Sequence, residues 1–123
     1  MNFTILDTDT REVIEFVDDP NLAIHELRVK QQTAGFAARL GAETVKLTPH
    51  TENEWTIELK IPLDVRRMHT PLPGDRVRFR ATAGVHEHEA TGTYQFKRHH
   101  SYVIFDDAGG EWEVQSMWQM KKL

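Results

Sequence analysis

The chain has 123 residues, of which 39% are hydrophobic and 28% are charged, and its formal net charge is −4. That length fits one domain or two small lobes that share a core, and the composition is ordinary for a globular protein. No apolar run is long enough to cross a bilayer, and the lack of cysteine excludes disulfides, thiolate metal sites and thiol catalysis. We expect a cytoplasmic protein without a signal peptide or a membrane partner.

Charge is unevenly distributed along the chain. Residues 1–59 carry five Lys and Arg against eleven Asp and Glu, and residues 60–123 carry ten against eight, so the net charges are −6 and +2. The change coincides with the proline-rich stretch IPLDVRRMHTPLPGD. The asymmetry indicates either that the two halves face different partners or that surface charge is divided by chance.

The first sixty residues predict two hairpins. Apolar residues alternate around the turn-forming DTDTRE, so residues 2–17 are expected to form a hairpin with four residues on one face: Phe3, Ile5, Val13 and Val17. The segments ETVKLTP and EWTIELKIP form the second hairpin through the turn HTEN. In its second strand, period-two alternation places four apolar residues together: Trp55, Ile57, Leu59 and Ile61.

A helix is predicted between the two hairpins. Asp19 is expected to cap it, Pro20 suits its first helical position, and Gly41 is expected to lie just past its end. Its apolar stripe is expected to contain Leu22, Ile24, Leu27, Ala34, Ala37 and Leu40. The polar KQQT and Gly35 in the middle leave either one helix with a break or two short helices.

Four strands are expected after the prolines, at residues 75–81, 89–97, 101–106 and 111–118, joined by AGVHEH, KRHH and DDAGG. No helical pattern appears beyond residue 41, and short strands at regular spacing favour a small barrel or meander. The predicted fold class is therefore α+β, with a β-β-α-β-β lobe over residues 1–62 and a small β-barrel of four or five strands over residues 72–123. The two form either separate lobes or one fused domain.

The barrel segment resembles a known class of small domains. The quoted pattern is GDRVRF, then ATGTYQF, then YVIFDDAGGEWEV, and it covers about residues 72–118. It resembles the Tudor-like and Src-homology-3-like small β-barrels. The resemblance implies a binding module, and in some Tudor-like domains an aromatic cage holds a methylated Lys or Arg. The residues near the corresponding strands are Tyr94, Tyr102 and Phe105; otherwise these rings fill the core.

A row of arginines suggests a second kind of surface. Arg76, Arg78 and Arg80 alternate with Val77 and its apolar neighbours, so they share one strand face. Joined by Lys97 and Arg98, they would form a basic stripe for DNA or RNA. Alternatively, the arginines are paired across the sheet with acidic residues, for which the candidates are Glu87, Glu89, Glu111 and Glu113.

The sequence contains little that indicates catalysis or metal binding. His86 and His88 share a face if VHEHE is extended, but zinc needs three or four converging ligands, and whether this pair binds metal stays open. No glycine-rich phosphate loop or nucleophile-elbow motif is present. We therefore expect no enzyme activity, no catalytic residues, no metal site and no cofactor.

The expected function is recognition of another protein, as an inhibitor, adaptor or assembly factor. The partner-binding surface is expected on the acidic N-terminal hairpin, with Asp7, Asp9, Glu12 and Glu15 docking on a basic partner. The alternative is a nucleic-acid-binding module that uses the basic stripe of the barrel.

Overall fold

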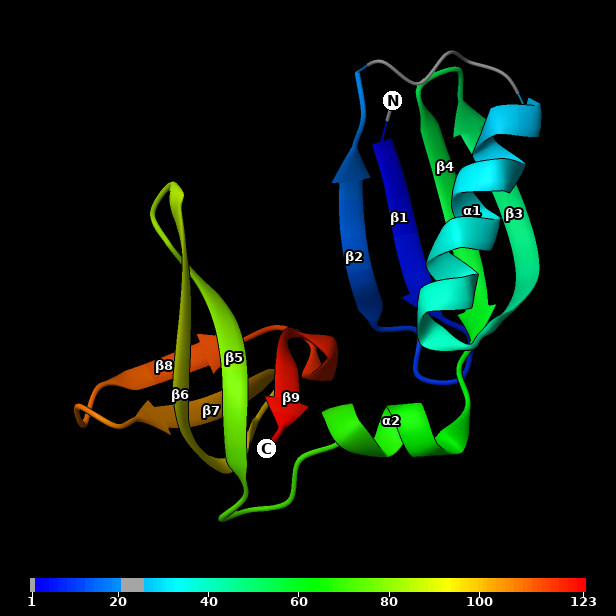
Figure 1. Cartoon of the computed structure of the whole chain (residues 1–123). Helices are drawn as coiled ribbons and strands as arrows, with labels where there is room; N and C mark the ends of the chain where they lie inside the picture. The colour runs from blue at the N-terminus through cyan, green and yellow to red at the C-terminus, as the bar shows by residue number, and fades with distance from the viewer. Residues whose placement is uncertain (1, 21–25) are drawn as a thin grey trace. The chain divides into compact units, whose positions relative to one another are not determined.

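The computed structural model describes residues 2–20 and 26–123, which form a mixed α+β structure with nine strands in two open sheets (Figure 1). The chain divides into two compact units, Met1–Val65 and Arg66–Leu123, which we call the N-terminal unit and the C-terminal unit. Neither sheet closes on itself within the described residues. Across these residues, no helix combines the length and apolar character needed to span a membrane.

The N-terminal unit contains one four-stranded sheet. Its strands are β1 (Asn2–Asp7), β2 (Val13–Asp18), β3 (Glu43–Thr51) and β4 (Glu54–Lys60). The order is β2-β1-β4-β3, with β1 and β4 parallel and the outer strands antiparallel to their neighbours. Both predicted hairpins are confirmed. The parallel central pair requires a long crossover connection, which contains the helix.

Helix α1 (Glu26–Leu40) lies across one face of this sheet (Figure 1). Residues at a spacing of four are buried on it, namely Val29, Thr33 and Ala37. The expected stripe is therefore wrong in part, because Leu27 is 58% exposed and Ala34 is exposed as well. Thr33 enters the core because its hydroxyl donates to the Val29 carbonyl oxygen at 2.7 Å, which satisfies the buried polar group.

The end of α1 forms as its sequence predicts. Gly41 has φ +63°, and its N–H donates to the Ala38 oxygen, while the Ala42 N–H donates to the Ala37 oxygen. This pair of bonds is the Schellman motif, which satisfies the last carbonyl groups of a helix. At the other end, Pro20 lies in a turn rather than in the helix. The predicted stripe residues Leu22 and Ile24 lie outside the described residues.

The C-terminal unit contains a five-stranded sheet. Its strands are β5 (Arg76–Ala83), β6 (His86–Arg98), β7 (Ser101–Asp106), β8 (Glu111–Val114) and β9 (Met120–Lys122). The order is β8-β7-β6-β5-β9, so the last strand pairs with the first. A short 3-10 helix, η1 (Met117–Gln119), lies between β8 and β9, and helix α2 (Leu63–His69) lies between Pro62 and Pro71.

Three expectations for this half of the chain are wrong. The segment 82–88 is not a loop, because β5 and β6 continue as a paired hairpin up to a two-residue turn at Gly84, whose φ is +65°. The expected strand 111–118 stops at Val114 and gives way to η1. Helix α2 was not predicted, because seven residues are too few to display helical periodicity.

The facing of β5 is confirmed. Val77, Phe79 and Ala81 are buried, whereas the three arginines between and before them are exposed. The sheet curls strongly, since the Trp112 ring of β8 lies 6.0 Å from the Phe79 ring of β5. Alternation on a curled sheet thus places the apolar residues inside and the guanidinium groups outside.

Candidate functional site

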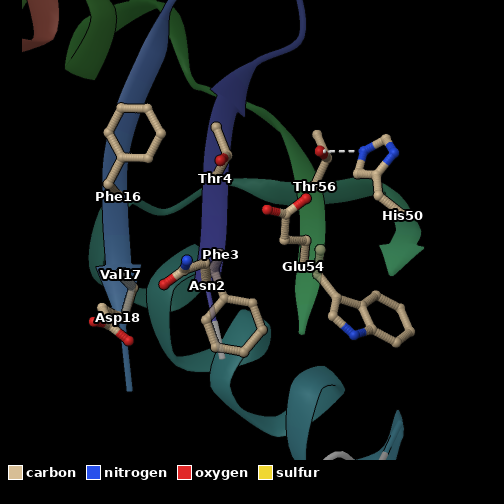
Figure 2. A pocket seen from close by; sticks show the side chains of 10 residues that line it. Asn2, Phe3, Thr4, Phe16, Val17, Asp18, His50, Glu54 and Thr56 are labelled. Carbon is tan, nitrogen blue, oxygen red and sulfur yellow. Dashed lines mark hydrogen bonds between the residues drawn. The ribbon is translucent and has the colours of Figure 1, made fainter. Parts of the chain in front are cut away.

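The face of the N-terminal sheet that turns away from α1 carries an exposed aromatic ring. Phe3 and Ile5 of β1 are buried, so Thr4 between them points to the opposite face. Thr4 lies directly across from Phe16 on β2 and from Thr56 on β4. Figure 2 shows these side chains on neighbouring strands. Phe16, on the edge strand β2, is 73% exposed, which is a large exposure for an aromatic ring.

A hollow of about 400 Å³ lies beside this ring (Figure 2). Its lining combines aromatic rings, hydroxyl groups and carboxylates: Phe16, Trp55, Thr4, Thr56, Asp18 and Glu54. The two carboxylates belong to the next cross-strand row, because Asn2 lies directly across from Asp18 on one side and Glu54 on the other. The hollow therefore has an apolar wall at Phe16 and an acidic end.

His50 of β3 also lines this hollow. Its Nε2 lies 2.6 Å from the Thr56 hydroxyl oxygen, as the dashed line in Figure 2 marks, and the histidine tautomer decides which group donates. The bond holds both side chains at one side of the hollow. We call the set Phe16, Thr4, Thr56, His50, Asp18 and Glu54 the recognition face.

On the same face of the sheet, acidic and basic side chains are paired at the other end of the strands. Leu6 lies across from Glu58, and Glu58 lies across from Lys46. Glu58 also forms an ion pair with Arg11. The acidic end of the face, with Asp18 and Glu54 in the row that contains Asn2, lies at the opposite end of the strands.

The expected acidic surface of the hairpin is not a single surface. Asp7 is 0% exposed, which corrects its assignment to a partner-binding face. Its Oδ1 accepts hydrogen bonds from the N–H groups of Asp9 and Thr10, at 2.9 and 3.5 Å, so it orders the turn after β1. Asp9 is exposed in that turn. Glu15 lies across from the buried Ile5 and so points toward the other face of the sheet from Phe16.

Each arginine of the expected basic stripe contacts a carboxylate. Arg76 makes a bidentate pair with Asp107 at 2.6 and 2.9 Å. The other pairs, at 2.7 to 3.8 Å, are Arg78–Glu89, Arg80–Glu87, Arg98–Glu111 and Arg98–Glu113. Lys97 lies over the Tyr102 ring at 5.1 Å. The stripe is therefore a charge-compensated surface whose exposed pairs contribute little stability individually.

The three rings proposed for a cage do not converge. Tyr94 and Tyr102 are buried, with ring centroids 6.1 Å apart. Burial raises the pKa of Tyr94 above its ordinary value, so the phenol stays neutral. Phe105 lies across from Thr93, one position out of phase with Tyr94, and is 42% exposed on the other face. The two tyrosines fill the core instead.

The paired histidines lie on the β5–β6 hairpin. His88 stacks on the Trp112 ring, with centroids 4.7 Å apart and an angle of 9° between the planes, and His86 is exposed near the turn. In residues 2–20 and 26–123, no group of three or more His, Asp or Glu side chains is arranged to hold a metal ion. His88 is thus engaged with an aromatic ring.

Comparison with known proteins gives no relative from which to transfer a function. No protein-family model matches the chain, and no curated protein or solved structure is significantly similar to it. Functional assignment therefore depends on the geometry of this chain.

Proposed function

We propose that this protein is a non-enzymatic recognition module that binds another protein through the recognition face. The observation that carries the proposal is the exposed Phe16 ring beside a hollow of about 400 Å³. An exposed aromatic ring next to a concave region is typical of interface hot spots, where a few large side chains supply most of the binding energy. Inhibitor, adaptor and assembly-factor roles all use such a surface.

Charge supports a basic partner. Asp18 and Glu54 lie at the acidic end of the hollow, beside the aromatic wall. The N-terminal unit as a whole has six Lys and Arg against twelve Asp and Glu. A lysine or arginine of the partner would place its alkyl stem against the Phe16 ring and its charge against the carboxylates. The remaining surface carboxylates of the hairpin, including Asp9, would steer the encounter through their long-range field.

Replacement of Phe16 tests the proposal directly. Phe16→Ser is expected to weaken capture of the partner from a lysate of the producing cells by about thirtyfold, equivalent to about 2 kcal/mol, because the anchor ring is lost. The matched control is Leu27→Ser, which removes an exposed apolar side chain from α1. Both variants should change the free energy of unfolding by less than about 0.5 kcal/mol.

The dependence of partner capture on nucleic acid and on the two carboxylates provides a second readout. Nuclease treatment should leave the capture unchanged, and Asp18→Asn with Glu54→Gln should slow association more than it speeds dissociation. Equal capture by the wild-type protein and Phe16→Ser would refute the recognition face. Loss of capture in Leu27→Ser alone would move the binding surface to α1.

A second candidate is nucleic-acid binding by the C-terminal unit. It is favoured by two exposed rings that each lie near an arginine. Phe105 lies across from Thr93, whose hydroxyl oxygen accepts a hydrogen bond from Arg76. The Arg98 guanidinium lies over the Phe96 ring, 5.3 Å from its centroid. Rings beside cations suit single-stranded bases and phosphates. Against it, those cations are already paired with carboxylates. If a mobility-shift assay with DNA or RNA at low salt shows no binding, this candidate is eliminated.

We further propose that the C-terminal unit belongs to the Src-homology-3-like or Tudor-like class of small barrels. Three features support this: a meander of the four strands β5 to β8, pairing of the last strand β9 with the first strand β5, and the 3-10 helix η1 before β9. The curl that brings Trp112 near Phe79 is a fourth. An experimental structure of the unit, compared with known small barrels, tests this assignment.

A further inference from the structure

We infer that the C-terminal unit binds a phosphoryl dianion in a hollow between β5, β9 and helix α2, independently of the recognition face. The hollow has a volume of about 190 Å³ and is lined by three cationic side chains, Arg78, Arg80 and Lys121. Arg78 and Lys121 lie directly across from each other on β5 and β9, and Arg80 follows on the same face of β5. Strand alternation therefore directs all three charges to one place.

The charge balance of the hollow matches a dianion. Glu89 is the one carboxylate in its lining, and it contacts the Arg78 Nε at 2.7 Å. The lining residues themselves carry three positive charges and one negative charge, an excess of two, and the one carboxylate outside the lining that contacts them in the described part of the chain is Glu87, next to Arg80. Arg80 is held only at 3.8 Å by Glu87, and the Lys121 ammonium group has no ion-pair partner among the described residues. Arg80 and Lys121 are thus able to turn toward a ligand at little cost.

The rest of the lining fixes the shape of the hollow. The His69 ring packs on the Trp118 ring with centroids 4.6 Å apart, and its Nδ1–H donates to the Met120 carbonyl oxygen at 2.5 Å. Burial, and to a smaller extent the charges of Lys121 and Arg80, lower the pKa of His69, so the ring is neutral near pH 7. Gln119 anchors the same region, because its Nε2–H donates to the Arg80 carbonyl oxygen.

Trp118, one of the lining residues, carries a donor that no group in the described residues uses. Trp118 is 4% exposed, and its buried Nε1 has no hydrogen-bond partner among the described residues. Most buried donors in proteins are satisfied, so an unsatisfied one marks a place where a ligand or water completes the structure. The tetrahedral oxygens of a phosphoryl group accept several hydrogen bonds at once and so suit a site with multiple N–H donors.

The test is a titration of the full chain with inorganic phosphate and, separately, with glucose 6-phosphate. The NMR signals of the Trp118 indole N–H and of the arginine side chains report the binding of each ligand. We expect saturable shifts at millimolar concentrations with both ligands. If only inorganic phosphate binds, the source is the free ion; if the ester binds at least as tightly, it is a phosphomonoester. Lys121→Ala should weaken binding about fivefold, because one charge-assisted contact is lost. Glu89→Gln should strengthen binding, because the competing carboxylate is removed.

Two matched controls separate a site from general attraction. Lys122→Ala removes the same charge from the next residue, which faces the other way and contacts Asp75 at 3.5 Å. Glu113→Gln removes an exposed carboxylate on β8. Neither should change phosphate binding. Equal effects of Lys121→Ala and Lys122→Ala, no saturation at tens of millimolar phosphate, or binding of single-stranded DNA without binding of either phosphate would each overturn the inference.

Discussion

Gly92 lies on β6 where the backbone of β7 comes closest to it. A Cβ atom at this position would lie 2.4 Å from the Phe105 carbonyl oxygen and 3.0 Å from the Asp106 Cα. Both contacts are with backbone atoms that cannot move away without breaking the β6–β7 pairing. The requirement for glycine here is therefore steric, because Gly92 has an ordinary φ.

Gly92→Ala should destabilise the C-terminal unit by about 2–3 kcal/mol, because the strands must separate to admit the methyl group. Gly35→Ala is the control, since a Cβ there meets no atom within 4 Å and Ala favours a helix interior by about 0.5–1 kcal/mol. Denaturant unfolding followed by NMR signals of each unit measures both effects. Equal stability of Gly92→Ala and wild type would contradict the close approach.

Asp106 fixes the turn between β7 and β8 through its carboxylate. The Trp112 Nε1–H and the Gly110 N–H donate to its two oxygens, each at 2.7 Å, and these bonds lower its pKa below the ordinary 3.8. Asp107 has a lowered pKa for a different reason, the hydrogen bonds from Arg76. Both carboxylates are thus stabilised in their charged form by the fold.

Acid should therefore weaken the C-terminal unit in a defined range. A lowered folded-state pKa stabilises the fold fully above the unfolded value of about 3.8, and this contribution is lost as the pH falls through the folded-state pKa. Asp106→Asn should lower the melting temperature at pH 7 and reduce its slope below pH 4. Thermal unfolding from pH 2 to 7 measures this effect. If Asp106→Asn loses stability in acid as much as the wild type does, this carboxylate is not a source of the acid-dependent loss of stability.

At the level of elements, short polar signals decided how strands and helices end. The capping bonds of η1 are reciprocal: the Trp118 N–H donates to the Ser116 hydroxyl oxygen at 3.2 Å, while the Gln119 Oε1 accepts from the Ser116 N–H at 3.0 Å. This arrangement lies in the five-residue connection, residues 115–119, between β8 and β9. It also allows β9 to pair with β5 and so complete the hollow around Lys121.

Ser116→Ala should therefore destabilise the C-terminal unit by about 1 kcal/mol, because a buried cap is lost. Ser101→Ala, a serine at the start of β7, is the control and should have a smaller effect. Denaturant unfolding measures both. A Ser116→Ala variant as stable as the wild type would show that the tertiary packing of Met117 and Trp118, rather than the cap, holds η1.

Helices and strands with strong local sequence patterns were predicted correctly, and those with weak patterns were not. Period-two alternation and turn residues located β1 to β8 but missed β9, and Gly41 located the end of α1. The stripe of α1 was misplaced because its second buried position is Thr33, whose polarity is hidden only by a bond to its own helix. Helix α2 and η1 were missed because they are too short for periodicity to show.

At the level of the whole molecule, charge asymmetry and site location were predictable to different degrees. The acidic character of the N-terminal unit was visible in the sequence, but burial of Asp7 was not, because it depends on the turn that this carboxylate itself orders. Phe16 had a signal that was available: Val17 lies across from the buried Phe3, so its neighbour Phe16 faces outward. The arginine pairs depended on strand register, which alternation alone does not fix.

The most direct test of the recognition face is photo-crosslinking from position 16 of the protein in a lysate of the producing cells. A benzophenone amino acid replaces Phe16, and a control protein carries it at the exposed Leu27 on α1. Recognition through the outer face of the N-terminal sheet predicts a discrete protein adduct from position 16, reduced by high salt and absent from position 27. Adducts of equal yield from both positions, or from position 27 alone, would contradict it.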